Sequence, residues 1–526
     1  MLLDRKRIRI ALIFVPFLLV SCLTANLGLM SSSSDLSPYS FGLAEAKTGL
    51  ERYQVILKTH EAAIQKGVNV DYRGIKTIEI EIPKKASRIP LTRYNDFHGC
   101  TFVIKNRQTT VYLFEAQEKS EPIQISKRDI DAGDFRRYLG HGKYLVLIED
   151  RNPWVNNRKG FSYGHQRRDI LLIKDGFAQN KTIMPYNNKE SDPECKVIPA
   201  ENTSIVIKNL TIHRTADSKA ITNIFYITGK CGVNLSNFSL HTPENDWRND
   251  RAVRIDDCTN IHFENVSIDG TYSRIDHSGY GISFDNVWNF TATNLVGRGT
   301  WGVFGTNNVN KASIKNSRIN RFDIHCYGRD VTFNNVDFFD RYNQFCSVYG
   351  DIVFEHCSFT NFDPVRNGGS YNAYVRHNIS FVDCVFNVSK SHNCLMRMGV
   401  LEDEYNKRKE LSEKCWPNVY IKNLTVNMDK TCSDVIVFYT MIKEDVEKIP
   451  IEYISTINID GFMINSPNDN IRLLMTSKSI KTREEVKWHL QNFFVNGERR
   501  DPLDPIDKSD ARLIRGRVKL VKRAHK

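Results

Sequence analysis

A short sequence motif repeats along the middle of the chain. In each copy, alternating apolar and polar residues are followed by an Asn and then by a further apolar residue. Alternation with a period of 2 predicts strands that bury one face. A repeat of about 20–30 residues predicts stacked β coils, because one coil cannot bury its own apolar face. Asn suits each corner, since it tolerates the left-handed backbone region and its amide can bond to the Asn of a neighbouring coil. The copies lie at residues 205–210, 233–238, 261–266, 290–295, 312–317 and 331–336, and looser copies end at His356, Asp383 and Asn423.

A second column of short strands precedes the first, and loops of unequal length lead into it. Coils of uneven length, with the extra residues gathered at one corner, are typical of a repeat protein that binds along one face. We therefore expect any site on this edge of the stack. The second column comprises residues 253–255, 282–284, 324–326, 346–348 and 373–375.

The pattern resembles the right-handed parallel β-helices of the pectin-lyase-like superfamily, over about residues 68–500 and most strongly over 201–390. The resemblance implies an all-β fold: a single-stranded right-handed parallel β-helix, or solenoid, with an N-terminal capping helix. That domain would span 50–500, with irregular first coils at 68–200, regular coils at 201–400 and C-terminal coils at 416–500. The superfamily holds lyases, hydrolases, epimerases, adhesins and phage tailspikes, so the resemblance is specific for fold and not for chemistry.

The N-terminus has the character of an export signal. Basic residues precede an apolar run at 10–20, which is too short to span a membrane. The run ends in Leu19-Val20-Ser21-Cys22, which resembles a bacterial lipobox. We expect a signal peptide at 1–21, lipidation of Cys22 and a tether at 22–49, which would anchor an exported protein at the cell envelope. An ordinary signal peptide with a chance cysteine is the alternative. Export also disfavours a tailspike.

Other segments give further expectations for secondary structure. Helical spacing at 50–66 predicts the helix that covers the bare edge of the first coil. Alternating stretches at 143–149 and 169–173 predict strands of the irregular coils. Short helices are expected at 401–415 and at 482–490.

The net charge of +12 arises mostly at the two ends of the chain, so the body is nearly balanced. A balanced body disfavours nucleic-acid binding. We expect the basic tail at 501–526 to include a final strand with a solvated charged face, and the protein to be a monomer.

The chain has 12 cysteines without a CxxC pair or a zinc-ligand spacing. Cys357 and Cys384 take the same inward position one coil apart. Buried free thiols that act as small core residues are therefore expected. Disulfides are the alternative in an exported protein.

The loops that enter the second column carry an Arg shortly before the strand, and aromatic residues that could stack on sugar rings lie near them. One Arg per coil, with Arg321 among them, would form a cationic ladder for a polymer bearing carboxylate or sulfate groups. Ordinary ion pairs with Asp323, Asp340 and Asp363 are the alternative. The predicted substrate-binding residues are Arg298, Trp301, Tyr327, Arg341, Tyr342 and Arg366.

Titratable side chains gather on the same edge. His325 is expected to face outward between the inward residues Ile324 and Cys326, which suits proton transfer. Asp276 and His277 lie in a loop one or two coils earlier. The predicted catalytic residues are His277, Arg321, Asp323, His325 and Asp340.

Two reactions fit these residues. In β-elimination, a base removes the proton α to a uronate carboxylate, while a cation, either Arg or Ca²⁺, neutralises that carboxylate. In hydrolysis, two carboxylates flank the glycosidic oxygen at roughly 5–9.5 Å, which Asp323 and Asp340 on adjacent coils could do. We expect a polysaccharide lyase slightly ahead of a glycoside hydrolase. A surface glycan-binding protein or adhesin is the non-enzymatic alternative.

Motifs of the superfamily's enzymes do not decide between these reactions. Asp256-Asp257 and Gly140-His141-Gly142 echo polygalacturonase motifs in the wrong order. Arg274-Ile275-Asp276-His277 echoes a pectate lyase motif without its Trp. No catalytic residue is carried over from either family.

Overall fold

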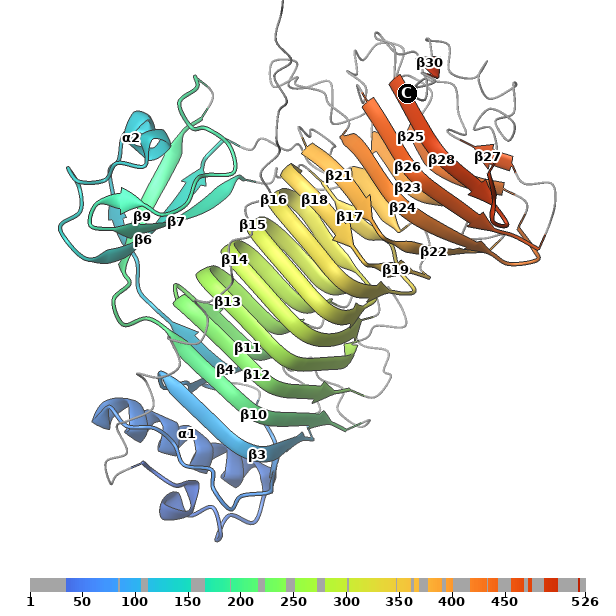
Figure 1. Cartoon of the computed structure of the whole chain (residues 1–526). Coiled ribbons are helices and arrows are strands. Elements are labelled where there is room, and N and C mark those ends of the chain that lie inside the picture. Colours follow the sequence, from blue (N-terminus) through green and yellow to red (C-terminus); the bar gives the residue numbers. More distant parts are fainter. Residues whose placement is uncertain are drawn as a thin grey trace, which may run out of the picture.

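Most of the described chain forms an elongated stack of parallel strands, and a small separate sheet lies at its side (Figure 1). The computed structural model describes residues 35–83, 86–105, 112–152, 166–189, 191–215, 223–242, 251–271, 280–299, 302–346, 348–360, 364–368, 377–389, 394–400, 417–432, 434–442, 456–467, 472–474, 487–499 and 519–520.

The stack contains the following strands: β1 (Thr77–Ile80), β2 (Ile89–Pro90), β3 (Tyr94–Ile104), β4 (Tyr112–Gln117), β10 (Ile205–Arg214), β11 (Asn223–Thr228), β12 (Cys231–His241), β13 (Arg251–Thr271), β14 (Tyr280–Gly299), β15 (Gly302–Ile319), β16 (Phe322–Phe338), β17 (Asn343–Phe345), β18 (Val348–Glu355), β19 (Ser358–Phe359), β20 (Val365–Gly368), β21 (His377–Val382), β22 (Val385–Val388), β23 (Cys394–Val400), β24 (Asn418–Met428), β25 (Asp434–Ile442), β26 (Thr456–Asn465), β27 (Arg472–Leu474), β28 (Lys487–Val495), β29 (Glu498–Arg499) and β30 (Lys519–Leu520).

Each long strand pairs in parallel with the strand one repeat later. β13 pairs with β14, β14 with β15 and β15 with β16. Apolar side chains therefore lie above one another inside the stack and form one continuous core. Phe354, for example, stacks between Phe333 and Phe381, with ring centroids 5.0 and 5.1 Å away. The repeat period had predicted this stacking.

The corners of the coils form the predicted Asn ladder. Asn209, Asn237, Asn265 and Asn294 all have positive φ values. The amide of each residue from Asn237 onward donates to the Asn before it, at 2.9–3.0 Å. Asn at these corners thus combines the left-handed backbone with a hydrogen bond between coils.

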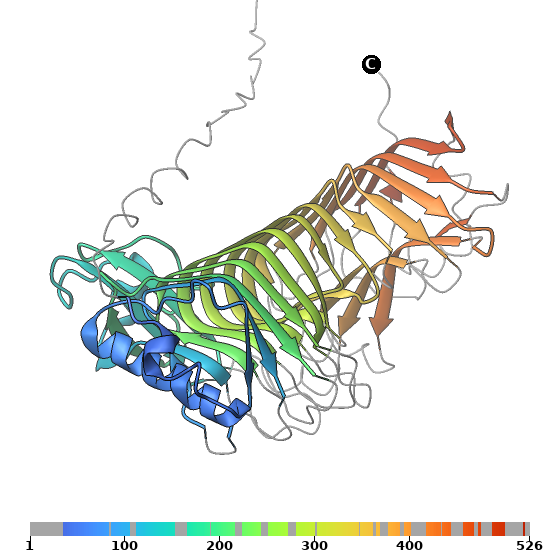
Figure 2. The ribbon, with the colours of Figure 1, turned by 90° about the horizontal axis from the view of Figure 1, so that it is seen from below.

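Helix α1 (Gly49–Lys66) packs on the N-terminal end of the stack (Figure 2). Its N-cap Thr48 and Glu51 form a capping box, and Gly67 ends the helix with φ of 66°. Its buried face, which includes Tyr53 and Ile56, joins the core of the stack. The helix lies where the apolar spacing predicted it.

The region expected to hold irregular coils folds differently. Residues 121–199 contain a separate antiparallel sheet in which β6 lies between β7 and β9. Strand alternation had correctly marked β6 and β7, but it cannot tell whether a strand pairs with its own repeat or with a hairpin partner. The elements are β5 (Glu121–Ile123), α2 (Lys127–Ala132), β6 (Lys143–Asp150), β7 (Arg168–Lys174), β8 (Phe177–Ala178) and β9 (Pro193–Pro199).

Two further expectations are corrected. Residues 35–48, expected within a tether, contain the 3₁₀ helix η1 (Pro38–Phe41) and a buried Leu43. The described part of the predicted helix at 482–490 belongs to strand β28. The predicted helix at 401–415 lies outside the described residues.

The cysteines whose side chains the structure describes are buried free thiols, as expected. These are Cys100, Cys195, Cys231, Cys258, Cys346, Cys357, Cys384, Cys394 and Cys432.

Candidate active site

One row of residues in the second strand column crosses successive strands of the stack. Asp323 occupies this row on β16, between Gly305 on β15 and Gln344 on β17. The row therefore passes through Asp323, two residues before His325, where it had been predicted. His325 lies just beyond Asp323, at an irregularity in the register between β15 and β16. In order along the stack, the row contains Tyr226, Arg254, Ser283, Gly305, Asp323, Gln344, Arg366 and Arg397.

Three polar side chains meet in a triangle at this row. The Tyr280 hydroxyl donates to Asp323 Oδ2 at 2.7 Å and lies 2.8 Å from His325 Nε2. His325 Nε2 lies 3.1 Å from the same carboxylate oxygen. The Asp323 side chain is fully buried, whereas that of His325 is 21% exposed. The arrangement places a solvent-accessible imidazole and a phenol over a buried carboxylate.

Arg321 pairs with Asp323 and is itself only 1% exposed. Its Nη2 also donates to Gln344 Oε1 at 3.1 Å. For this residue the structure supports the ion-pair alternative rather than a guanidinium that faces a substrate. Arg321 is therefore placed to hold the carboxylate, and through it the triangle.

The electrostatics keep Asp323 ionised. Burial alone would raise the pKa of Asp323, but the charge of Arg321, with help from His325 and Tyr280, lowers that pKa to about 2. Asp323 thus remains a carboxylate near neutral pH and cannot serve as a general acid there. It can orient the imidazole and stabilise an imidazolium.

Two glycines on β15 leave room for these side chains. A Cβ at Gly305 would lie 2.6 Å from the ring of Tyr280, and one at Gly302 would lie 2.8 Å from the side chain of Arg321. Tyr280 therefore reaches Asp323, two strands away, by lying across the bare backbone of Gly305. Tyr280 was missed at the sequence level because it precedes Asp323 by 43 residues.

Tyr342 lies between two guanidinium groups. The guanidinium carbon of Arg321 is 4.2 Å from the centre of its ring, and that of Arg366 is 3.6 Å away. Both distances are typical of cation–π contacts. The structure thus brings Arg321, Tyr342 and Arg366 together, as the predicted edge required.

Other predicted residues lie elsewhere. Tyr327 is 2% exposed and occupies a corner with φ of 56°, so its ring does not offer a sugar-stacking surface. Asp340 is exposed in the turn that joins β16 to β17, two residues before Tyr342. Arg341 follows it and is half-buried. The side chain of Arg298 lies outside the described residues, as do Cys22, His277 and Trp301.

A second acidic group lies on the same side of the stack, on β13 and β14. Asp256 and Asp285 face each other in register on neighbouring strands. Burial raises the pKa of Asp256 to about 7, against the opposing charge of Arg254, whose Nε lies 2.7 Å from Asp256 Oδ2. Arg168 from β7 binds Asp257 and Asp285 at 2.9 and 3.0 Å. The sequence alone had given Asp256-Asp257 no catalytic role, because the pair echoes a polygalacturonase motif in the wrong order.

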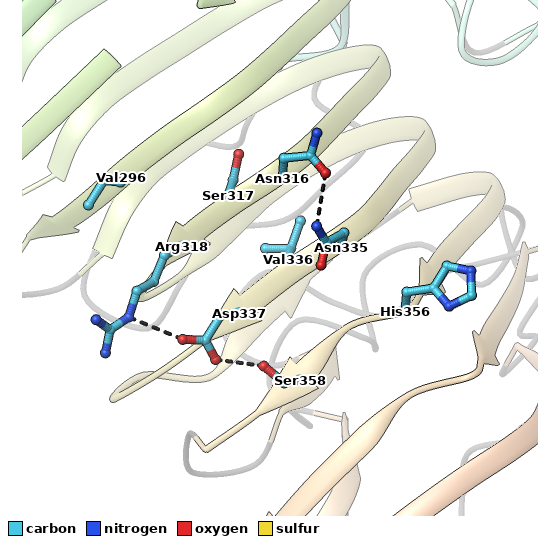
Figure 3. Close-up of a pocket in the computed structure, with 9 residues that line it drawn as sticks. All are labelled: Val296, Asn316, Ser317, Arg318, Asn335, Val336, Asp337, His356 and Ser358. Carbon is cyan, nitrogen blue, oxygen red and sulfur yellow. Dashed lines mark hydrogen bonds and ion pairs between the residues drawn. The ribbon is translucent and has the colours of Figure 1, made fainter. Parts of the chain in front are cut away.

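A hollow of about 310 Å³ lies over the C-terminal parts of β15 and β16 (Figure 3). Its polar groups satisfy one another, since Arg318 Nε lies 3.1 Å from Asp337 Oδ2 and the Ser358 hydroxyl donates to Asp337 Oδ1 at 2.7 Å. We therefore locate the candidate chemistry at the triangle and not in the hollow. Its lining comprises Val296, Asn316, Ser317, Arg318, Asn335, Val336, Asp337, His356 and Ser358.

Among the described residues, no group of three or more His, Cys, Asp or Glu side chains is arranged to hold a metal ion such as the Ca²⁺ considered above. Within the same part of the chain, neither α-helix is long and apolar enough to cross a bilayer.

No family model matches the chain, and no curated protein matches it in sequence. In structure the chain is similar to phage tailspikes, a class that the expectation of export had disfavoured. The Gp54 tailspike of Acinetobacter baumannii bacteriophage AP22, solved in complex with A. baumannii capsular saccharide, is 11% identical with a TM-score of 0.44, covering 88% of this chain and 79% of that one. The tailspike protein gp49 from Pseudomonas phage LKA1 is 12% identical with a TM-score of 0.45, covering 87% and 81%. The Pseudomonas phage phi297 tailspike gp61 is 11% identical with a TM-score of 0.42, covering 88% and 80%. At this level of similarity, function has to be argued from the site itself.

Proposed function

We propose that this chain is a right-handed parallel β-helix that cleaves an acidic, uronate-containing polysaccharide by β-elimination at Tyr280, Asp323 and His325. The supporting observation is the contact of one phenol and one imidazole, 2.8 Å apart, over a buried carboxylate. β-Elimination needs a base for the α proton and an acid for the leaving oxygen, and these two groups can supply both.

The reaction can be written with these residues in balanced steps. The imidazole of His325 takes the proton α to the uronate carboxylate, and the electron pair of that C–H bond forms the new double bond. The bond to the glycosidic oxygen breaks, and the Tyr280 hydroxyl gives that oxygen its proton. The proton on His325 then passes to the Tyr280 phenolate across the 2.8 Å contact, which restores both groups.

Asp323 and Arg321 act through Tyr280 and His325. The Asp323 carboxylate accepts the Tyr280 hydroxyl at 2.7 Å and lies 3.1 Å from His325 Nε2, so it stabilises the imidazolium formed during the reaction. Arg321 keeps this carboxylate ionised. We assign both of them as positioning residues.

Hydrolysis is the second candidate, and Asp256 is the observation that favours it. Asp256 is a buried carboxyl with its pKa raised to about 7, which suits a general acid, and it lies in register with the partly exposed Asp285, which offers the second carboxylate that a glycoside hydrolase requires. The pair lies on strands other than those of the triangle, so single substitutions separate the two reactions.

The test is to incubate the purified protein with a panel of uronate-containing and neutral polysaccharides. Elimination produces the ultraviolet absorbance of an unsaturated uronate, and hydrolysis produces new reducing ends without it. Retained glycan affinity with neither signal would instead favour a non-catalytic glycan-binding protein.

Variants locate the reaction. We expect His325→Ala and Tyr280→Phe each to lower kcat about 100-fold or more and to leave thermal unfolding nearly unchanged. His262→Ala is the matched control, since His262 lies on the other strand column and bonds to Thr291. Full activity in His325→Ala, or its loss only in Asp256→Asn, would reject the proposed site.

Export and a lipid anchor at Cys22 remain part of the proposal, with the chain acting as a monomer at the cell envelope. Metabolic labelling with a fatty acid in a bacterial host tests the anchor. Label on the wild type but not on Cys22→Ser supports it, whereas equal label on both rejects it.

A further inference from the structure

Two arginines share one row on neighbouring strands of the stack. Arg366 on β20 is in register with Arg397 on β23, and Gln344 on β17 precedes them in the same row. Neighbouring strands lie roughly 4.8 Å apart, so the two side chains leave the backbone at that spacing. Both residues are half-buried, and the Nε atom of each is shielded from solvent.

The surroundings fix one of the two guanidinium groups. Arg366 stacks on Tyr342 at 3.6 Å, and Tyr342 in turn stacks on the buried Arg321. A planar cation held by an aromatic ring loses little freedom when it binds an anion.

The row connects this pair to the triangle. Asp323, Gln344, Arg366 and Arg397 follow one another on β16, β17, β20 and β23. Arg366 is therefore two strand spacings from Asp323 and Arg397 is three, or roughly 10 and 14 Å along the stack. A chain that lies along the row and reacts at His325 also crosses both arginines.

We propose that Arg366 and Arg397 form a subsite for a carboxylate of an acidic glycan, on the side of His325 toward the C-terminus. The sequence had predicted a ladder of arginine side chains on this edge, with Arg321 among them. Arg321 instead pairs with Asp323 inside the fold, whereas Arg366 and the newly identified Arg397 lie in the row itself. The subsite rests on the proposed function for its ligand.

Binding is measured first, in the His325→Ala background, so that turnover does not remove the ligand. The probes are a polyuronate and the same polymer with its carboxyl groups reduced to alcohols. We expect Arg397→Met to weaken polyuronate binding at least tenfold, to lower its salt dependence by about one released counterion, and to leave binding of the reduced polymer unchanged.

Two controls accompany this variant. Arg318→Met removes an exposed cation that pairs with Asp337 and should not change binding. Arg397→Lys keeps the charge without the planar fork, and it should restore part of the affinity. Thermal unfolding confirms that each variant is folded.

Activity then separates the two proposals. Polyuronate binding that depends on Arg397, without cleavage, keeps the subsite and rejects the elimination reaction. Cleavage at His325 that is indifferent to Arg397→Met, in kcat and in KM, rejects the subsite and keeps the reaction. Equal binding of the charged and the reduced polymer, or binding of neither, also overturns the subsite.

Discussion

Gly305 decides whether the phenol of Tyr280 can take part in the site. A Cβ at this position would lie 2.6 Å from the Tyr280 ring, well inside van der Waals contact. We expect Gly305→Ala to push the ring aside and to lower kcat about 100-fold, since displacements of about 1 Å cost that much in an active site. Steady-state kinetics on the cleaved glycan measure the effect.

A double-mutant cycle checks the cause. Gly305→Ala should add no further loss on a Tyr280→Phe background, because both changes remove the same hydroxyl contact. Ser283→Ala, in the same row one strand away, is the control and should be nearly silent. Independent losses from Gly305→Ala and Tyr280→Phe would contradict this account of Gly305.

Asp256 should make the stability of the fold pH-dependent. Burial raises its pKa from 3.8 to about 7 in the folded chain. The folded state therefore binds the proton more tightly than the unfolded state, so this contribution is complete below about pH 4 and is lost as the pH rises through about 7. We expect Asp256→Asn to raise stability by about 2 kcal/mol at pH 8 and to have little effect at pH 4.

Unfolding in urea over a series of pH values measures this difference. Asp192→Asn, at an exposed carboxyl, is the control. A wild type and an Asp256→Asn variant whose stabilities run parallel from pH 4 to pH 8 would show that Asp256 is ionised throughout.

At the residue scale, the sequence located part of the site. The motif Arg321, Asp323 and His325 could be found because its members alternate within one short stretch of the chain. Tyr280, Gln344 and Arg397 could not, because they meet this strand only through the register of the coils. The register was misjudged by two residues at β16, where an irregular pairing breaks the alternation on which the prediction depended.

At the scale of elements, the corner Asn residues join coils that the chain separates by a whole repeat. Asn265 donates to Asn237 at 3.0 Å and accepts from Asn294 at 3.0 Å, with φ of 54°. Asn265→Ala loses both bonds and meets the left-handed penalty for a side chain with a Cβ, so we expect a loss of about 2–3 kcal/mol. Chemical denaturation measures it.

Asn265→Gly separates the two contributions. Glycine adopts a positive φ freely but offers no amide, so this variant should lose only the hydrogen bonds, about 1–2 kcal/mol. Glu264→Ala, at the exposed neighbouring position, is the control. Equal losses for the alanine and glycine variants would mean that backbone strain contributes nothing at this corner.

Helices and strands could be predicted where apolar residues recur with a strict period. The stacked strands and helix α1 follow from local patterns, because burial imposes a period of 2 on a strand and 3.6 on a helix. Strands β6 and β7 carry the same alternation, but their antiparallel pairing depends on the residues between them. The stretch at 487–490 is a strand although the sequence favoured a helix, since pairing with β26 decides its state.

At the scale of the molecule, polar contacts and an apolar cluster attach the small sheet to the side of the stack. The cluster includes Leu145 and Ile170 of the small sheet and Cys231 of the stack. Arg168 on β7 binds Asp257 and Asp285, and its backbone amide donates to Asn308 Oδ1 at 2.9 Å. Farther along, Asn310 donates to the carbonyl of Lys181 at 2.8 Å. The small sheet also has an apolar cluster of its own, built around residues such as Phe135 and Val146. Each part therefore has a core of its own besides the shared apolar cluster, and Arg168 is a charged link between the two parts.

Arg168→Met should accordingly loosen the attachment without unfolding either part. The variant leaves Asp257 and Asp285 without their shared cation, which should cost about 2 kcal/mol for a largely buried group. We expect faster hydrogen exchange at the amide of residue 168 and in the segments that connect the small sheet to the stack, with protection inside β6 and β13 unchanged. Arg136→Met, which removes an exposed pair with Asp134 on the small sheet, is the control. Loss of protection throughout β6, β7 and β9 would instead mean that the small sheet depends on the stack for its own fold.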